Sequence, residues 1–527
     1  MTTGLSKELE TEVAKRRTFA IISHPDAGKT TLTEKLLLFG GAIRLAGTVK
    51  GRKASKHATS DWMEIEKQRG ISVTSSVMQF DYEGHRVNIL DTPGHQDFSE
   101  DTFRTLTAAD SAVMLIDVAK GVETQTKKLF QVCRMRGIPI FTFINKLDRE
   151  GRDPFDLLEE LEEVLGIRSY PMNWPIGSGK QFCGVYDRGK SQLELFQGDD
   201  HKQIKVRKVS GVDDPLVKEI AGEFLHKQLS QEIELLDGAG DPFDMEKVMK
   251  GELTPVFFGS AINNFGVQTF LENFLQLAPQ PEPRNSNAGV IEPTKPKFSG
   301  YVFKIQANMN PAHRDRIAFL RIVSGKFERG MSVRHSRAGK EIKLSQPQQF
   351  LAQDRDIVDE AFAGDIIGLF DPGIFRIGDS LSQGEEVIFD ELPTFSPELF
   401  SKVTVKNALK HKQYQKGIDQ LTEEGTIQVF TTIGFEDIIL GVVGQLQFEV
   451  FEHRMKNEYG VDIQLMRQNY QFARWIVDEK VDPGKFRINS QLVKDKKGND
   501  VVLFESEYAL RSAMEKNPTA KFLPNAP

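Results

Sequence analysis

The sequence contains little cysteine: among its 527 residues only Cys133 and Cys183 are present. Two thiols cannot form a disulfide framework or a cysteine zinc site, and such scarcity is typical of a reducing cytosol. The N-terminus, MTTGLSKELETEVAKRR, lacks the apolar segment of a secretion signal, and no apolar run reaches membrane-spanning length. We therefore expect a cytoplasmic protein that does not contact a membrane.

An excess of positive charge is also missing. The formal net charge is −7, so the chain as a whole does not attract nucleic acid, and any contact with RNA must use local basic patches. The hydrophobic content of 39% and charged content of 27% are typical of globular proteins. Because single cores rarely grow beyond about 250–300 residues, we expect about three or four domains. We also expect a monomer that binds no DNA.

A phosphate-binding loop lies near the N-terminus. Residues 19–22 predict a buried strand, and Leu32, Leu36 and Phe39 fall on one face of a following helix. The segment between them is Ser23-His24-Pro25-Asp26-Ala27-Gly28-Lys29-Thr30, the phosphate-loop pattern with serine in place of the usual first glycine. Its backbone N–H groups would face an anion, its lysine would reach the β- and γ-phosphates, and its threonine would offer a hydroxyl to Mg²⁺. The alternative is a strand-to-helix turn that binds nothing.

A polar, basic arm follows, from residue 40 to residue 70. Its basic residues are Lys50, Arg52, Lys53, Lys56 and His57. A charged segment just after a phosphate loop is a candidate switch that orders when the γ-phosphate and Mg²⁺ are present. Ser72 is its expected metal-reaching hydroxyl. The alternative is a solvated surface loop.

A second motif follows a predicted hairpin. Residues 77–82 and 86–90 alternate like strands around Glu83-Gly84, and the second strand runs into Asp91-Thr92-Pro93-Gly94-His95. An aspartate at a strand's carboxyl end can hold Mg²⁺ through water, and the glycine N–H can contact the γ-phosphate. The alternative is a simple turn with a helix cap.

A third motif predicts the base. The apolar strand 139–144 ends in Asn145-Lys146-Leu147-Asp148. The Asp148 carboxylate can accept two N–H bonds from guanine N1 and N2, which adenine cannot supply. Asn145 can bond the other edge of the base while the Lys146 stem covers its face. Since a site built for a donor group rejects an analogue that lacks it, we predict GTP and GDP as ligands.

The set SHPDAGKT, DTPGH and NKLD resembles the translational GTPases, the family of elongation factors Tu and G. The resemblance adds the segment FFGSA at residues 257–261, whose Ser-Ala backbone would touch the base. It also implies that His95 orients the attacking water with help from ribosomal RNA; the alternative is a histidine packed at a helix start. The predicted catalytic residue is His95. The predicted nucleotide-binding residues are Ser23, His24, Pro25, Asp26, Ala27, Gly28, Lys29, Thr30, Thr31, Asp91, Thr92, Pro93, Gly94, His95, Asn145, Lys146, Asp148, Ser260 and Ala261. The predicted metal-binding residues are Thr30, Ser72 and Asp91.

The rest of the chain predicts several domains. About 110 residues separate Asp148 from Ser260, with a helix near 157–165, a strand-rich part at 174–196 and a helical part at 217–236. This resembles the inserted subdomain of elongation factor G, either a docking surface or an inert elaboration. A proline cluster at 279–283 predicts a semi-rigid linker.

From residue 300 short strands punctuated by glycine predict a β-barrel. Arg321, Lys326 and Arg329 could contact ribosomal RNA there or could line a solvated strand face. From about residue 400 the order β-α-β-β-α-β predicts a split βαβ, ferredoxin-like α+β domain, whereas the last sixty or so residues predict no particular fold. We therefore expect a multidomain chain: an α/β P-loop GTPase domain at 1–280 with an insert at about 150–255, a β-barrel at 285–390 and an α+β domain at 391–527.

The third domain narrows the range of functions that the chain could have. An α+β unit in this place points toward elongation factor G, and the whole arrangement resembles the bacterial class II release factors. That resemblance implies a ribosome-dependent GTPase of translation termination. It would promote the dissociation and recycling of codon-reading class I release factors after peptide release, with ribosomal RNA and proteins as further partners. The alternatives are a GTPase factor of elongation or ribosome rescue, and a metabolic GTPase subunit of sulfate activation.

Overall fold

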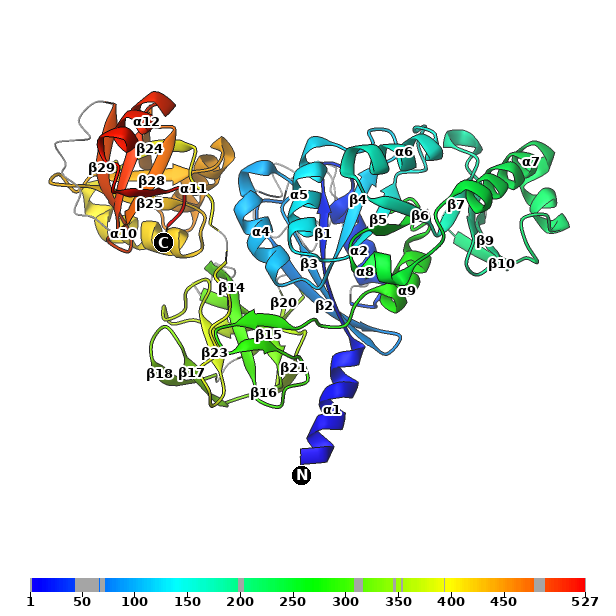
Figure 1. Cartoon of the computed structure of the whole chain (residues 1–527), viewed down its shortest axis with the longest axis horizontal. Coiled ribbons are helices and arrows are strands. Elements are labelled where there is room, and N and C mark those ends of the chain that lie inside the picture. Colours follow the sequence, from blue (N-terminus) through cyan, green and yellow to red (C-terminus); the bar gives the residue numbers. More distant parts are fainter. Residues whose placement is uncertain are drawn as a thin grey trace.

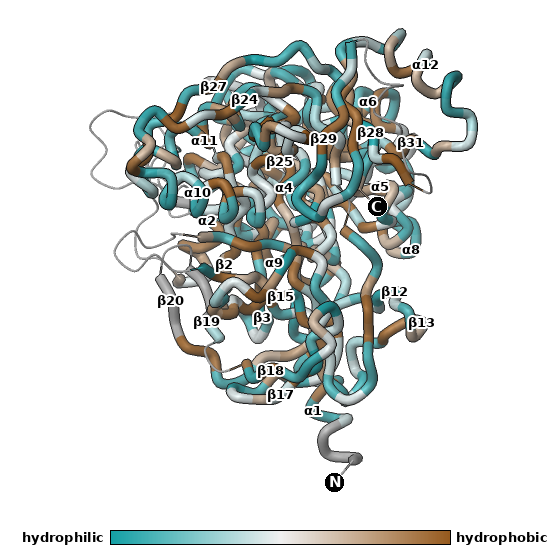
Figure 2. Tube along the Cα trace, turned by 90° about the vertical axis from the view of Figure 1, so that its left-hand side faces the viewer, coloured by the Kyte–Doolittle hydropathy of each residue, from teal (hydrophilic) through white to brown (hydrophobic). Residues whose placement is uncertain are grey.

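The computed structural model describes residues 2–42, 66, 72–197, 203–307, 316–344, 347–351, 354–392, 394–477 and 489–526. Figure 1 shows a GTPase domain flanked by the C-terminal domain on one side and by the insert on the opposite side, with the barrel below. Several strands of the sheets consist of apolar residues along their length, whereas many loops are polar (Figure 2). The predicted multidomain architecture is confirmed. Most of the predicted switch arm lies outside the described residues.

A mostly parallel sheet forms the centre of the GTPase domain. Its strand order is β2-β3-β1-β4-β5-β11-β6, in which β2 is antiparallel to β3 and the other pairs are parallel. The strands are β1 (Arg16–Ser23), β2 (Ser76–Tyr82), β3 (His85–Asp91), β4 (Ser111–Asp117), β5 (Ile140–Asn145), β6 (Arg168–Pro171) and β11 (Leu253–Phe258). The helices are α1 (Thr2–Lys15), α2 (Lys29–Phe39), η1 (Gln96–Phe98), α4 (Ser99–Thr107), α5 (Thr124–Met135) and α9 (Val267–Leu277).

Both faces of this sheet are buried, as the continuous apolar strands predict. Successive side chains of β1 point to opposite faces, so Phe19 and Ile21 pack with α2 and α9, whereas Ala20 and Ile22 pack with α4 and α5. The predicted hairpin is confirmed, with Glu83 and Gly84 both at positive φ. Because β1, β3, β4 and β5 run in the same direction, their carboxyl ends meet at one edge.

The insert forms a small unit of its own. A four-stranded antiparallel sheet in the order β10-β9-β8-β7 packs on the long helix α7. The predicted helix over 157–165 is divided: α6 ends at Glu160, and residues Leu161–Leu165 form a π-helix. The elements are α6 (Pro154–Glu160), η2 (Leu161–Leu165), β7 (Asn173–Ile176), η3 (Gly179–Gln181), β8 (Gly184–Asp187), β9 (Gln192–Gln197), β10 (Gln203–Lys208), α7 (Pro215–Ala239) and α8 (Met245–Met249).

A buried carboxyl group ties the insert to the GTPase domain. Glu194 on β9 is 2% exposed and contacts the Thr269 hydroxyl of α9. Burial raises its pKa from the ordinary 4.5 to about 7. The folded state therefore favours the protonated form, so this contribution to stability is complete below pH 4.5 and is lost as the pH rises through about 7.

We expect the Glu194→Gln variant to unfold at a higher temperature than the parent protein at pH 8.5 and at a similar temperature at pH 4.5. Glutamine keeps a neutral acceptor, so the variant avoids a penalty of about 3 kcal/mol for ionising the buried carboxyl. Thermal unfolding at the two pH values measures the difference. Glu219→Gln, at an exposed position of α7, is the control. An equal stability of Glu194→Gln and parent protein at pH 8.5 would contradict the prediction.

The two cysteines are free. Burial raises the pKa of Cys133 to about 12 and that of Cys183 to about 11, so neither is a thiolate at neutral pH. No helix in the described ranges is long and apolar enough to cross a membrane.

The barrel that follows has its own apolar core, which includes Val302, Leu320, Ile322 and Phe327. Its strands continue the hydrogen bonding of the GTPase sheet through one bridge between Leu351 of β19 and Met78 of β2. The strands from the linker onward are β12 (Arg284–Ser286), β13 (Gly289–Ile291), β14 (Ser299–Ala307), β15 (Arg316–Ser324), β16 (Lys326–Glu328), β17 (Ser332–His335), β18 (Lys340–Lys343), β19 (Pro347–Leu351), β20 (Asp354–Ile357), β21 (Glu360–Phe362), β22 (Ile366–Phe370) and β23 (Ser380–Ser382).

One interpretation of the barrel's basic residues is wrong. Arg321 is 1% exposed, lies 2.6 Å from Asp110 of the GTPase domain and donates to the carbonyl of Gly364. A guanidinium in this position holds two domains together and cannot contact RNA. Lys326 is paired with Glu360 at 2.9 Å, and Arg329 remains half exposed beside Asp359.

The C-terminal domain confirms the split βαβ arrangement. Its first four strands lie in the ferredoxin-like order β27-β24-β26-β25, and the unassigned last segment extends the same sheet by β29-β30-β28-β31. The elements are β24 (Leu399–Val405), η4 (Ala408–Lys410), α10 (His411–Glu423), β25 (Gln428–Thr432), β26 (Ile438–Val442), α11 (Gln445–Asn457), β27 (Ile463–Gln468), β28 (Phe472–Val477), β29 (Ser490–Asp495), β30 (Asp500–Phe504), α12 (Glu507–Lys516) and β31 (Lys521–Leu523).

Candidate nucleotide-binding site

The phosphate loop lies between β1 and α2, as predicted. Two residues bend it through left-handed backbone conformations, Asp26 with φ 67° and Gly28 with φ 103°. Ser23, which replaces the usual glycine, closes β1 outside the left-handed region. A glycine's conformational freedom is therefore required at Gly28 and not at Ser23.

Gly28 also leaves no room for a side chain. A Cβ added there would lie 2.3 Å from the Asn145 side-chain nitrogen, in a backbone conformation that other residues rarely adopt. Strain and overlap each cost about 1–3 kcal/mol, so we expect Gly28→Ala to weaken GDP binding at least about 30-fold. Titration with a fluorescent GDP analogue measures the loss. Gly137→Ala is the matched control, because Gly137 has a positive φ but open space around it; similar affinities of the two variants would contradict the steric argument.

Two of the predicted metal-binding residues, Asp91 and Ser72, meet at the lysine of the loop. The buried ammonium group of Lys29 pairs with the Asp91 carboxylate and lies 3.4 Å from the Ser72 hydroxyl. Thr30 is the next residue of the same helix and is also buried. Two hydroxyls and a carboxylate are hard oxygen donors that suit Mg²⁺. In the described part of the chain no group of three or more histidine, cysteine or acidic side chains could hold a metal ion.

Asn145 fastens two loops of the site together. Its side-chain nitrogen donates to the carbonyl of Ala27 at 2.9 Å, and its oxygen accepts from the Ala261 N–H at 2.9 Å. The phosphate loop and the segment at residues 259–261 are therefore held at a fixed distance. In this structure both ends of the amide are occupied by backbone partners.

Lys146 has a partner that the sequence did not reveal. Its ammonium group lies 2.6 Å from Asp117 at the end of β4 and 2.6 Å from the carbonyl of Asp26. Burial opposes ionisation of Asp117, yet the bonds from Lys146 and from the Ala119 N–H keep its pKa below the ordinary value. The carboxylate holds the lysine stem over the phosphate loop. The sequence did offer a signal for this pair, because Asp117 ends a strand that lies beside the strand ending in Asn145.

Asp148 lies next to Ser260, in the predicted base-contacting segment at residues 257–261. One oxygen of its carboxylate accepts a hydrogen bond of 2.5 Å from the Ser260 hydroxyl, although 112 positions separate the two residues. Ser260 and Ala261 are fully buried. The carboxylate is thereby oriented by one neighbour while its other oxygen lies toward Arg149, at 3.8 Å.

His95 follows the strand end that carries Asp91. Its Nδ1 accepts a hydrogen bond of 3.2 Å from the Asp97 N–H and lies 3.4 Å from the Asp97 carboxylate. That carboxylate raises the pKa of His95 against the opposing effect of burial. Sequence reasoning missed Asp97, because an aspartate at a helix start is ordinarily a cap.

The remaining predicted residues lie around the loop. Gly94 lies close to Pro25: a Cβ built on Gly94 would be 3.5 Å from the Pro25 backbone. The Thr92 hydroxyl donates to the carbonyl of Ile21 at 2.7 Å, and His24 faces Glu123 at 3.4 Å. Thr31 is partly buried in the first turn of α2. The structure thus places every predicted site residue at one edge of the sheet.

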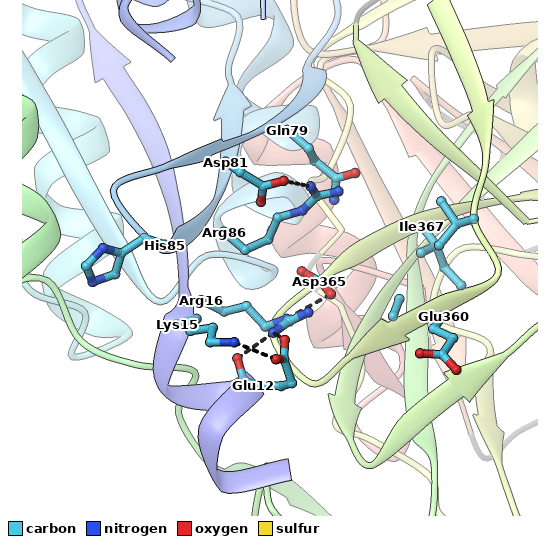
Figure 3. Close-up of a pocket in the computed structure, with 13 residues that line it drawn as sticks. Glu12, Lys15, Arg16, Gln79, Asp81, His85, Arg86, Glu360, Asp365 and Ile367 are labelled. Atoms are coloured by element: carbon cyan, nitrogen blue, oxygen red, sulfur yellow. Dashed lines mark hydrogen bonds and ion pairs between the residues drawn. The ribbon is translucent and has the colours of Figure 1, made fainter. Parts of the chain in front are cut away.

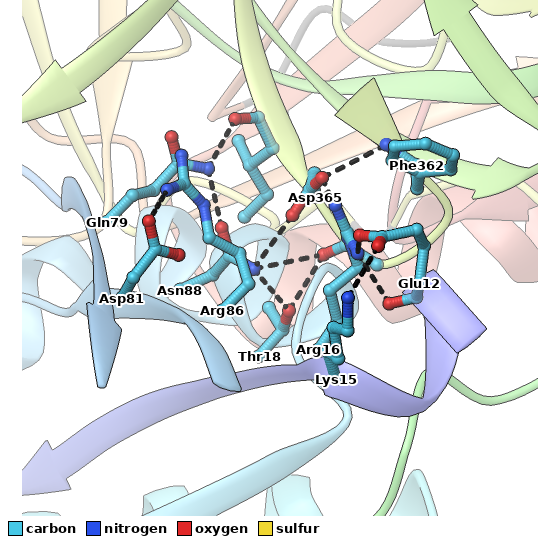
Figure 4. A network of polar contacts seen from close by, with 12 residues as sticks. Glu12, Lys15, Arg16, Thr18, Gln79, Asp81, Arg86, Asn88, Phe362 and Asp365 are labelled. Carbon is cyan, nitrogen blue, oxygen red and sulfur yellow. Dashed lines mark hydrogen bonds and ion pairs between the residues drawn. The ribbon is translucent and has the colours of Figure 1, made fainter. Parts of the chain in front are cut away.

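A second cleft, of about 400 Å³, lies away from this site, between α1, the β2–β3 hairpin and the barrel (Figure 3). Its charges are paired: Arg16 bonds to Asp365 at 2.8 Å, and Arg86 bonds to Asp81 at 3.0 Å. Figure 4 shows the polar network that continues behind it, where Asn88 donates to Thr18 and Gln79 donates to Asn88. We interpret this cleft as part of the interface between two domains.

Comparisons with known proteins agree with this geometry. The family model "Elongation factor Tu GTP binding domain" matches residues 14–280, and "Elongation factor G domain 2" matches residues 297–384. The model "Class II release factor RF3, C-terminal domain" matches residues 389–514. A crystal structure of a Thermus thermophilus protein has a TM-score of 0.70 at 24% identity, covering 92% of this chain and 72% of that one, which supports the fold alone.

Two curated relatives extend over nearly the whole chain. Peptide chain release factor 3 of Symbiobacterium thermophilum is 65% identical over 514 residues, which are 97% of each chain. Peptide chain release factor 3 of Listeria innocua is 59% identical over 515 residues, 98% of each chain. Fold, site and matched domain define a GTPase of the elongation-factor class. Within that class, the chain belongs to the peptide chain release factor 3 family.

Proposed function

We propose that this GTPase acts on the ribosome in translation termination, where it promotes the dissociation and recycling of codon-reading class I release factors after peptide release. The observation that carries the proposal is the class II release factor match over residues 389–514, together with named relatives at 59–65% identity. The same match favours termination over elongation, rescue or sulfate activation. A protein that acts on ribosomes is expected in the cytoplasm, so the proposed function also implies a cytoplasmic location.

The geometry suggests a division of labour among the site residues. Lys29 and the backbone of the loop would bind the phosphates, while Asp148 and the Ser260-Ala261 segment would bind guanine. Asn145 would act mainly by holding these two loops together, as its bonds to Ala27 and Ala261 suggest. Thr30, Ser72 and Asp91 would hold Mg²⁺, which neutralises charge on the β- and γ-phosphates.

His95 is the proposed catalytic residue. Phosphoryl transfer depends mainly on positioning and on charge stabilisation, so a histidine that orients the attacking water fits the chemistry. We also propose the domain limits 1–280, with an insert at about 150–255, then 285–390 and 391–527. GTP and the ribosome would favour the same arrangement of these domains, each by its difference in affinity for the two states.

Peptide release from stop-codon ribosomes tests the proposal, with a class I release factor in limiting amount. We expect repeated turnover of that factor only when this protein and GTP are both present. Release that is unchanged by the protein, despite GTP hydrolysis stimulated by ribosomes, would exclude a role in termination. GTP hydrolysis that ignores ribosomes would exclude any ribosomal role.

A further inference from the structure

Asp97 contacts two domains at once. On one side its carboxylate and N–H both face Nδ1 of His95. On the other side its second carboxylate oxygen accepts a hydrogen bond of 2.7 Å from the Leu446 N–H, in the first turn of α11. The contact with Leu446 joins positions 349 residues apart in the sequence.

The first turn of α11 is a suitable seat for a carboxylate. Its free N–H groups and the helix dipole both favour a negative charge there. Although burial opposes ionisation, His95 and the Leu446 N–H together lower the pKa of Asp97. Asp97 is therefore an anion that is shared between the histidine and the C-terminal domain.

The fit around this carboxylate is tight. Gly444 precedes α11, and a Cβ built on it would lie 1.9 Å from the carboxylate carbon of Asp97. The backbone of Gly444 is extended, with φ −141° and ψ 163°, so its conformation does not require glycine. The close approach of Asp97 is what leaves no space for a larger residue.

Apolar contacts also hold the segment around Asp97 against the C-terminal domain. Val73, Phe98 and Val450 form a small buried cluster, with Leu446 packed against it. Beside it the Phe103 and Phe395 rings lie 4.9 Å apart, and the Arg104 guanidinium approaches the carbonyl of Gly425 at 3.5 Å. The histidine segment is thus docked on the C-terminal domain by more than one kind of contact.

We propose that Asp97 is a positioning residue for His95 and that α11 fixes Asp97, so that docking of the C-terminal domain controls the orientation of the catalytic histidine. This inference rests on the role proposed for His95. It makes the C-terminal domain part of the hydrolytic machinery without a residue of its own at the nucleotide. The link is mechanical: the helix holds the carboxylate, and the carboxylate holds the ring.

Two variants break the link from opposite sides. Asp97→Asn keeps the size and an acceptor for Leu446 but removes the charge beside His95. Gly444→Ala forces the helix and Asp97 apart without altering either residue of the pair. Gly238→Ala is the control for the added methyl group, because nothing lies within 4 Å of its Cβ position.

The test is steady-state GTP hydrolysis by the full-length protein over a range of ribosome concentrations, together with GDP affinity and thermal unfolding. We expect kcat to fall about tenfold in Asp97→Asn and at least about threefold in Gly444→Ala, with KM for ribosomes and GDP affinity within about twofold. The double variant should be no slower than the slower single variant, because both changes break one link. Gly238→Ala should behave as the parent protein.

The inference is overturned if Gly444→Ala hydrolyses GTP as fast as Gly238→Ala, or if the two effects multiply in the double variant. Parallel losses of GDP affinity and stability would also overturn it, since they indicate a purely structural contact. His95→Ala in the same assay separates the two levels. If His95→Ala hydrolyses GTP as fast as the parent protein, the proposed role of His95 is wrong as well. If His95→Ala is slow while Asp97→Asn and Gly444→Ala are not, only the proposed coupling to the C-terminal domain is wrong.

Discussion

Replacement of His95 by alanine is expected to reduce ribosome-stimulated GTP hydrolysis by about 10³-fold or more, the scale of activation that a partner provides in phosphoryl transfer. His95 follows the strand end that bears Asp91, and Asp97 orients its ring. Alanine would leave the water unoriented. Binding should persist, because the phosphate loop and the guanine segments do not depend on the imidazole. Quench-flow measurement of phosphate release, with GTP and GDP affinities determined separately, checks both expectations.

The matched control for His95 is its exposed neighbour Gln96, the first residue of the short helix η1 that His95 caps. Gln96→Ala should hydrolyse GTP within about threefold of the parent rate, the range usual for a surface change that touches no reacting group. If His95→Ala also remained in that range on ribosomes, water positioning would have to be assigned to another group. A loss of GTP affinity in His95→Ala would indicate instead that the loop between Asp91 and α4 had rearranged.

Replacement of Asp148 by asparagine is expected to weaken GTP and GDP binding by roughly 10²–10⁴-fold. Two hydrogen bonds from guanine to a carboxylate contribute about 1.5–3 kcal/mol each, and asparagine would turn a donor toward one of guanine's donors. The variant should still fold, because its carbonyl oxygen can keep the bond from the Ser260 hydroxyl. A nucleotide with a carbonyl group at C2 of the base should bind the variant better than guanine does.

Isothermal titration with GDP and with xanthosine diphosphate measures this exchange of preference. Asp156→Asn, at an exposed position at the start of α6, is the control and should bind GDP normally. Equal GDP affinity of Asp148→Asn and the parent protein would show that the base is recognised elsewhere. Weak binding of both diphosphates would show that the asparagine had disturbed the Ser260 segment.

Much of the nucleotide site could be predicted because it depends on local patterns. A strand, a glycine loop and a helix follow one another within twenty-odd residues, and the ends of parallel strands meet at one edge whatever the rest of the chain does. The positions of Asp91, Asn145 and Asp148 after apolar strands were therefore sufficient to place these side chains at that edge of the sheet. The ferredoxin-like unit was predictable for a similar reason, since its strands and helices alternate with clear periods.

The features that the sequence did not predict all depend on contacts between segments that are distant in the chain. Arg321 looked like a surface residue because its partner, Asp110, lies 211 positions earlier in another domain. Asp97 was not singled out because its partner Leu446 lies 349 residues later, in another domain. The last segment was unassigned because β28 pairs with β30 and β31 and not with its neighbour β29. In α1, by contrast, Leu9 and Val13 are buried at helical spacing, a signal that the sequence did offer.

The carbonyl of Gly364 has a consequence for the integrity of the chain. It accepts hydrogen bonds from Thr18, Asn88 and Arg321, which come from the GTPase sheet and from the barrel. The bonds from Thr18 and Asn88 cross between the two domains, so separation of the domains would break them at a net cost of about 0.5–1.5 kcal/mol each. The boundary between the two matched family models, between residues 280 and 297, therefore marks a change of fold but no weak point. Under heat or denaturant we therefore expect the GTPase domain and the barrel to unfold as a single cooperative unit.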